Sequence, residues 1–244
     1  MTRPLDVLAI GPHPDDVELA CGGTLAGLAR AGRRVGILHL TRGEAGTRGT
    51  PEQRRQEAEA AAAALGAVEL VLLDCGDGAL RHGPAEEDAL IAELRRLRPE
   101  LVLGPPAVDR HPDHGRSHRL VADACFYSGL ARRGQGTPHR PAAVFTYMLH
   151  DGFEPSFVVD VTATWAVKMA ALDTYESQIH RPGAVTADQD APPTKIASRE
   201  FRLSVEGRAR HFGGLVGAEL GEPFLSRTPL AVADVWTLLP GGLR

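Results

Sequence analysis

The sequence has few of the features that mark a membrane-spanning, secreted or nucleic-acid-binding protein. No run of about 18 uninterrupted apolar residues occurs, since even residues 60–73 contain Gly66 and Glu69. The first residues contain no apolar core followed by a small-residue cleavage site. The formal net charge is -4, so no basic field attracts a nucleic-acid backbone or an anionic membrane. We therefore expect a cytoplasmic protein that binds neither nucleic acid nor a membrane.

Cysteine is also scarce. Cys21, Cys75 and Cys125 are odd in number, widely separated and outside any C-x-x-C pair. This pattern argues against a disulfide framework and against a thiolate metal site. We expect all three cysteines to be small core residues.

Apolar runs of strand length alternate with helical segments through the first 130 residues. The expected strands are residues 5–10, 34–40, 68–73 and 101–104. The expected helices are residues 18–30, a segment from Pro51, residues 86–98 and residues 115–127. Such alternation predicts an α/β fold: a Rossmann-like, mostly parallel sheet with helices on both faces, in a single domain over residues 1–244.

The alternation loosens beyond residue 130. Residues 143–148 and 157–161 are expected as strands, and residues 164–175 and 199–216 as helices, which together form a C-terminal strand and helix extension. Residues 178–194 are rich in proline and glycine and poor in apolar residues, so we expect a mobile loop there.

Two loops that follow expected strands concentrate histidine and aspartate. His13-Pro14-Asp15-Asp16-Val17-Glu18 follows the first strand, and Asp109-Arg110-His111-Pro112-Asp113-His114 follows the fourth. Ligands of open α/β sheets bind beyond the carboxyl ends of the strands. For one such loop, an aspartate that caps the next helix is an equally good explanation. Two loops of this kind favour a functional site.

The residue types suit a catalytic metal. Catalytic zinc commonly has three protein ligands, histidine and carboxylate among them, and a fourth position for water. His13 and Asp16, three residues apart across a turn, can converge on one ion, and the second loop then needs to add only one imidazole. Zinc and iron(II) both suit such a set.

The two motifs resemble the signature of the PIG-L/LmbE-like N-acetylglucosaminyl deacetylases. The similarity continues through Gly22-Gly23-Thr24, Thr41-Arg42-Gly43-Glu44-Ala45-Gly46 and Arg54-Arg55-Gln56-Glu57-Ala58. It covers most of the first 130 residues and implies hydrolysis of an N-acetyl group with a bound metal, Zn²⁺ or alternatively Fe²⁺.

The resemblance also implies roles for individual residues. The implied metal ligands are His13, Asp16 and His114. Asp15 is the implied general base, and His111 the implied electrophile and acid. Asp113 is expected to hydrogen-bond His111 and favour its protonated form. Arg54 matches a position that contacts substrate.

Within that family the chain is most similar to the bacillithiol-pathway branch, which deacetylates N-acetylglucosaminyl-malate. The similarity rests on Tyr175-Glu176-Ser177-Gln178 and on the helix that leads to Arg208-Ala209-Arg210. Candidates for binding the malate carboxylates are the cations near the site loops, with Glu44 as a further substrate contact; the cations are Arg42, Arg48 and Arg110. The glycine-rich loop 41–50 is either a lid or a plain connection. Relatives are often oligomeric, which implies a homo-oligomer with a small sugar substrate.

Three other functions remain open at this stage. The substrate is alternatively another N-acetylglucosamine conjugate or a chitobiose-type sugar. Two histidines and one carboxylate also form the metal site of non-haem iron oxygenases, although those enzymes are mostly β-barrels. A non-catalytic metal- or sugar-binding protein is the third.

Histidines outside the two motifs are interpreted as structural or surface residues. His39 lies in an expected strand and is interpreted as packed, and His118 as an ordinary helical histidine. The remaining five have no motif around them: His82, His139, His150, His180 and His211.

Overall fold

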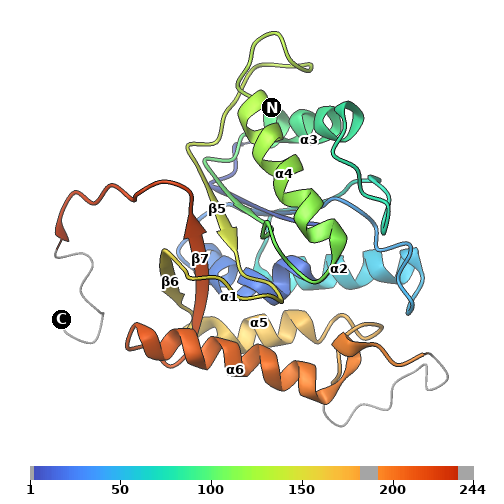
Figure 1. The fold of residues 1–244 in the computed structure, drawn as a ribbon, viewed down its shortest axis with the longest axis vertical. Coiled ribbons are helices and arrows are strands. Elements are labelled where there is room, and N and C mark those ends of the chain that lie inside the picture. The colour runs from blue at the N-terminus through green and yellow to red at the C-terminus, as the bar shows by residue number, and fades with distance from the viewer. Residues whose placement is uncertain (1–2, 182–191, 236–244) are drawn as a thin grey trace.

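In the computed structural model, which describes residues 3–181 and 192–235, seven strands form one sheet (Figure 1). Their order is β3-β2-β1-β4-β5-β7-β6. The strands are β1 (Val7–Gly11), β2 (Val35–His39), β3 (Glu69–Leu72), β4 (Leu101–Gly104), β5 (Ala143–Tyr147), β6 (Phe157–Asp160) and β7 (Gly221–Ser226). Strands β3 to β5 in this order are parallel, and β7 lies antiparallel between β5 and β6.

Helices cover both faces of the sheet (Figure 1). One face carries α1 (Asp16–Arg30), α2 (Pro51–Leu65), α5 (Trp165–Leu172) and α6 (Arg199–Leu215); the other carries α3 (Pro84–Leu97) and α4 (Pro112–Tyr127). Short 3-10 helices span Thr162–Thr164 and Lys195–Ala197. Alternate residues of β1 enter opposite cores, Val7 and Ala9 on the α1 side and Leu8 and Ile10 on the α4 side. This period of two explains why β1 is apolar throughout.

The predicted α/β fold with a mostly parallel sheet is confirmed. Three helices begin earlier than expected. Helix α1 starts at Asp16 and α3 at Pro84, and α4 starts at Pro112 because His111 caps it and proline suits the first helical position. Strand β7 was not predicted, because Gly221-Glu222-Pro223 has neither the alternation nor the composition of a strand. Most of the expected 178–194 loop lies outside the described residues.

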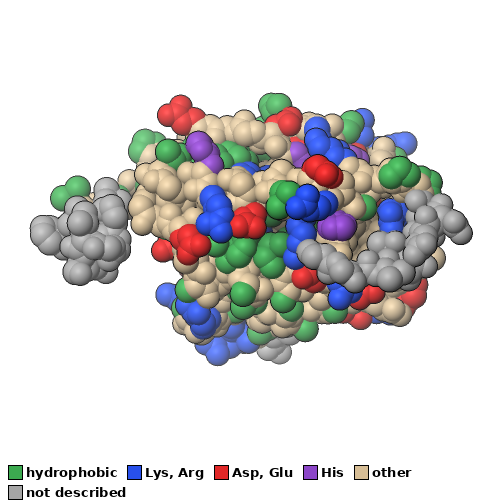
Figure 2. Space-filling model, turned by 90° about the horizontal axis from the view of Figure 1, so that it is seen from below, with side chains coloured by type: hydrophobic (Ala, Val, Ile, Leu, Met, Phe, Trp, Pro, Cys, Tyr) green, Lys and Arg blue, Asp and Glu red, His purple; other side chains and the backbone are tan. Residues whose placement is uncertain are grey.

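None of the helices in the described part of the chain combines the length and the apolar character needed to cross a bilayer. On the face in Figure 2, acidic and basic side chains lie among one another rather than in fields of one sign.

Candidate active site

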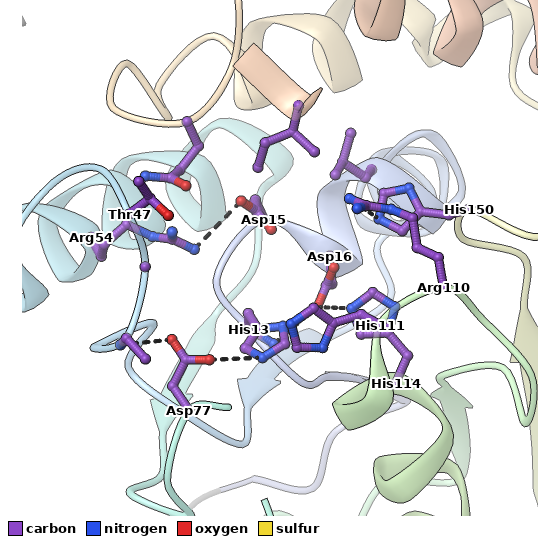
Figure 3. Close-up of a pocket in the computed structure, with 15 residues that line it drawn as sticks. His13, Asp15, Asp16, Thr47, Arg54, Asp77, Arg110, His111, His114 and His150 are labelled. Carbon is purple, nitrogen blue, oxygen red and sulfur yellow. Dashed lines mark hydrogen bonds and ion pairs between the residues drawn. The ribbon is translucent and has the colours of Figure 1, made fainter. Parts of the chain in front are cut away.

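The two His/Asp loops converge at one edge of the sheet, because β1 and β4 are adjacent and parallel. A cavity of about 220 Å³ opens there. Arg54 and Asp15 lie on one side of it, and Arg110 and His150 on the other (Figure 3). Its lining consists of His13, Asp15, Asp16, Leu19, Ala45, Gly46, Thr47, Arg54, Asp77, Arg110, His111, His114, His150, Gln178 and Ile196.

The first loop is a constrained turn. Asp15 has φ of 102°, a backbone region that non-glycine residues other than Asp and Asn rarely occupy. Neighbouring carbonyls are held from outside the turn: Thr41 donates to the carbonyl of Pro12, and Arg54 donates to that of Pro14. The backbone N–H of His13 donates to Asp16 Oδ2 at 3.0 Å. The turn therefore directs both Asp15 and Asp16 into the pocket.

The second loop caps helix α4. The Nδ1 atom of His111 accepts a hydrogen bond from the backbone N–H of Asp113 at 3.2 Å. Among the described residues, the expected bond between the Asp113 carboxylate and His111 is not formed, because the carboxylate has other partners. The carboxylate instead accepts from the N–H of Gly78 at 2.8 Å and faces His13 Nε2 at 3.4 Å.

Asp16 lies between the other two implied metal ligands. Its Oδ2 atom is 3.1 Å from His13 Nδ1 and 3.5 Å from His114 Nε2. Four donors arranged tetrahedrally at zinc bond lengths of roughly 2.0–2.1 Å are about 3.3–3.4 Å apart. The two spacings around Asp16 thus fit a shared divalent ion.

The outward-facing nitrogens of both histidines have carboxylate partners. His114 Nδ1 lies 2.8 Å from Asp109, and His13 Nε2 lies 3.1 Å from Asp77. Metal-binding histidines almost always bond through their second nitrogen to such a partner, which fixes the ring and its tautomer. Each ring consequently keeps its other nitrogen toward Asp16, so the donor set fits a metal.

The neighbouring carboxylates raise the pKa values of His13 and His114. Burial lowers the pKa of His13, but hydrogen bonds to Asp113, Asp16 and Asp77 outweigh it and raise that pKa well above 6.5. Burial also lowers the pKa of His114, but the effects of Asp16 and Asp109 outweigh it, so this pKa is raised as well. A metal ion must therefore displace protons from both rings.

The pKa values of Asp15 and His111, which are not implied metal ligands, shift in opposite directions. Burial raises the pKa of Asp15 to about 7, against the lowering effect of Arg54. Burial and the nearby His13 lower the pKa of His111. The lowered pKa of His111 favours the neutral ring over the protonated form expected from the sequence, and a pKa of about 7 suits Asp15 to act as a base near neutral pH.

The predicted substrate contacts divide into two groups. Arg54 and Arg110 line the pocket, whereas Arg42 and Glu44 lie outside its lining. Arg42 pairs with Asp74 at 3.0 Å, and Glu44 accepts backbone hydrogen bonds from Arg42 and Asp77. Both were predicted from nearness in sequence, which does not fix where a side chain points.

Loop 41–50 is hydrogen-bonded to other segments at Ala45 and Arg48. The Ala45 N–H donates to Asp77, and Arg48 Nε donates to the carbonyl of Ser177. Gln178 in turn donates to the carbonyl of Arg48. The loop forms part of the pocket wall, and Arg48 connects it to the segment around Ser177.

Sequence reasoning missed Asp77 and misinterpreted His150. The His150 ring lies 5.6 Å from that of His114, centroid to centroid, and the backbone N–H of His150 donates to Asp109 Oδ2. Both residues follow parallel strands, β3 and β5, at the edge that carries the two motifs. Both residues could have been identified by examining the segment that follows each parallel strand. By contrast, His118 bonds the Pro105 carbonyl and does not line this pocket.

Known proteins with similar sequences and structures point to one family. The protein-family model described as "PIG-L: GlcNAc-PI de-N-acetylase" matches residues 8–125 of this chain. A diacetylchitobiose deacetylase of Thermococcus kodakarensis is 32% identical over 188 residues, covering 70% of this chain and 69% of that protein.

Two solved structures extend the similarity beyond the matched segment. The conserved protein TT1542 from Thermus thermophilus is 36% identical, with a TM-score of 0.84 and coverage of 94% of this chain and 98% of its own. An N,N'-diacetylchitobiose deacetylase from Pyrococcus horikoshii is 25% identical, with a TM-score of 0.75 and coverage of 89% and 82%. The sequence motifs, the fold and these relatives agree: the chain belongs to the PIG-L family.

Proposed function

We propose that this chain is a zinc-dependent hydrolase that removes the acetyl group from an N-acetylglucosamine-type sugar. The observation that carries the proposal is Asp16 Oδ2, which lies within 3.5 Å of one nitrogen each of His13 and His114 while Asp15 opens into the same pocket. Deacetylase relatives that act on diacetylchitobiose support the substrate class.

The proposed ligands and Asp15 together deal with the weak nucleophile. His13, Asp16 and His114 would hold a divalent ion, which would acidify a water and polarise the acetyl carbonyl. Asp15 accepts the proton of that water, and its pKa of about 7 suits this role. Arg54 Nη2, 3.4 Å from Asp15 Oδ2, holds the carboxylate in place.

His111 serves as a neutral hydrogen-bond donor in this mechanism. Its Nδ1 accepts from the Asp113 N–H, so the single proton of the neutral ring is on Nε2. That N–H stabilises negative charge on the acetyl oxygen as the tetrahedral species forms. The leaving amine then takes its proton from Asp15, which received one in the first step. This replaces the acid role expected for His111 from the sequence.

The finer substrate proposal is N-acetylglucosaminyl-malate, as in bacillithiol synthesis. Arg110 lies at the pocket with its Nη2 atom 3.4 Å from His150 Nε2, and it is exposed. A guanidinium in this position suits a substrate carboxylate. We also propose that the protein is cytoplasmic and forms a homo-oligomer. Light scattering of the purified protein tests the oligomeric state.

Metal analysis combined with product detection tests the function. The zinc-loaded protein is incubated with N-acetylglucosamine, its malate conjugate and diacetylchitobiose, and free amine and acetate are measured. We expect equal amounts of both products, loss of activity with a chelator, and recovery with zinc. Preference for the conjugate supports the finer proposal, and iron(II) is compared under anaerobic conditions. Absence of amine release from all three sugars contradicts the proposed substrate class.

A further inference from the structure

Helix α1 is broken just behind the pocket. Cys21, inside the helix, has φ of -136° and ψ of 20°, which are not helical values. The turn before the break carries Asp16 and Leu19, and both line the pocket. The direction of this first turn therefore determines where the Asp16 carboxylate lies.

A buried ion pair is inserted at the break. In a regular helix the Gly23 N–H bonds to the carbonyl of Leu19. Here the Gly23 N–H donates to Glu222 Oε1 at 3.0 Å, and Lys168 Nζ donates to the Leu19 carbonyl at 2.9 Å. Lys168 also donates to Glu222 Oε1 at 2.6 Å. The pair bridges the two backbone groups, and insertion of side chains into the helical ladder is a known cause of kinks.

The other oxygen of Glu222 caps the helix segment that begins after the break. It accepts from the Thr24 N–H at 2.7 Å and from the Thr24 hydroxyl at 2.6 Å. A Cβ atom on Gly22 would lie 3.3 Å from Lys168 Cγ, and one on Gly23 would lie 2.8 Å from the Val161 side chain. The Gly22-Gly23-Thr24 motif therefore has a physical explanation: two small residues admit the pair, and threonine binds it.

The position of the pair in the fold favours a role beyond packing. Lys168 and Glu222 are each 2% exposed, and Arg208 adds a second side-chain contact to the Leu19 carbonyl at 3.3 Å. Buried ion pairs are weak contributors to stability compared with apolar residues of similar size. This pair instead contacts backbone groups on both sides of the break: the Leu19 carbonyl before it, and the Gly23 and Thr24 N–H groups after it.

We propose that Lys168 and Glu222 are positioning residues that set the direction of the first turn of α1 and so hold Asp16, with Asp15 before it, at the pocket. The role of those two aspartates rests on the proposed function. The pair itself comes from α5 and β7, far along the chain from the two motifs.

A double variant, Lys168→Met with Glu222→Gln, tests the proposal because it removes both charges without leaving one unpaired. We expect the melting temperature to change by only a few degrees. In the metal-free protein, amide exchange of Leu19 and Ala20 should become at least about tenfold faster. Zinc affinity, measured by chelator competition, should fall about 10–100-fold, the range found when groups behind metal ligands are altered. In steady-state assays kcat should fall while KM stays within twofold.

Arg95→Met is the matched control. Arg95 is a buried cation whose guanidinium binds the carbonyls of Ser128 and Leu130, and it does not line the pocket. Its loss should lower stability but leave Leu19 exchange and zinc affinity unchanged. If this variant changes them as much as the double variant does, general loosening explains the effect and the proposal is wrong.

Two further outcomes are decisive. Exchange and zinc affinity within twofold of the parent protein in the double variant overturn the proposal. If the double variant does not fold, Thr24→Val serves instead, because it removes only the hydroxyl contact to Glu222. It should give a smaller increase in amide exchange at Leu19 and Ala20. Unchanged exchange in Thr24→Val contradicts the proposal. A parent protein that binds zinc but releases no amine contradicts the proposed function alone, because exchange and affinity are measured without substrate.

Discussion

The two halves of the chain contribute differently to the pocket. Before residue 128, each proposed ligand or reacting group belongs to a short motif after a parallel strand, as in Asp15 and His111. After residue 140, most contributions are supports: the Tyr147 hydroxyl donates to the Ile10 carbonyl, and Tyr175 donates to buried Glu18 at 3.0 Å. The difference teaches that local motifs supply the chemistry, whereas distant segments supply its placement.

If this division is correct, changes in the first motif should have the largest effects. Asp16→Ala removes the oxygen shared by His13 and His114. We expect loss of bound zinc and of detectable turnover with the fold retained, because two remaining ligands hold the ion poorly. Zinc content after dialysis, together with circular dichroism, checks this, and retention of one zinc per chain argues against the ligand set.

Asp15→Asn separates the base from the ligands. Asparagine tolerates the same backbone conformation but accepts no proton, so metal should remain while turnover falls at least about 100-fold. The measurement is kcat at matched zinc occupancy. Full activity in this variant removes Asp15 from the mechanism.

His111 distinguishes a neutral donor from an acid. Glutamine can present an N–H where Nε2 lies, so His111→Gln should keep more activity than His111→Ala, for which we expect a loss of about 100-fold or more. Zinc occupancy should stay complete in both variants. Equal, complete inactivation of both favours proton transfer by the imidazole instead.

Asp109 joins the two halves and should have an intermediate effect. One oxygen holds His114 Nδ1, and the other accepts from the backbone N–H groups of His150 and Asp151. Asp109→Asn should weaken zinc binding about 10–100-fold. Chelator competition measures it, and an unchanged affinity shows that the backbone contacts alone hold the loop.

Arg42→Ala should have the smallest effect. Its ion pair with Asp74 is solvent-exposed, and such pairs contribute roughly 0–1 kcal/mol. We expect kcat/KM within twofold of the parent protein on every sugar tested. A selective loss on the malate conjugate returns Arg42 to the substrate contacts.

The sequence predicted what is local and missed what depends on three-dimensional packing. The two motifs were identifiable because several ligand-type residues are adjacent in each. Asp77 and His150 are single residues, and only the register of the parallel sheet brings them to the same edge. Glu222 was not identified because nothing in Gly221-Glu222-Pro223 indicates a strand or a helix partner. The Asp113 carboxylate contacts His13 and Gly78, which are distant in the sequence, so spacing within its own motif does not predict these partners.

The backbone at Asp15 also limits which residues can replace the base. With φ of 102°, position 15 accepts glycine, asparagine and aspartate most readily, and aspartate is the only one of the three that carries a charge. A redesign that lengthens the reach of the carboxylate with glutamate would have to rebuild the turn as well. The backbone conformation at position 15 thus restricts both natural substitutions and engineered ones to very few side chains.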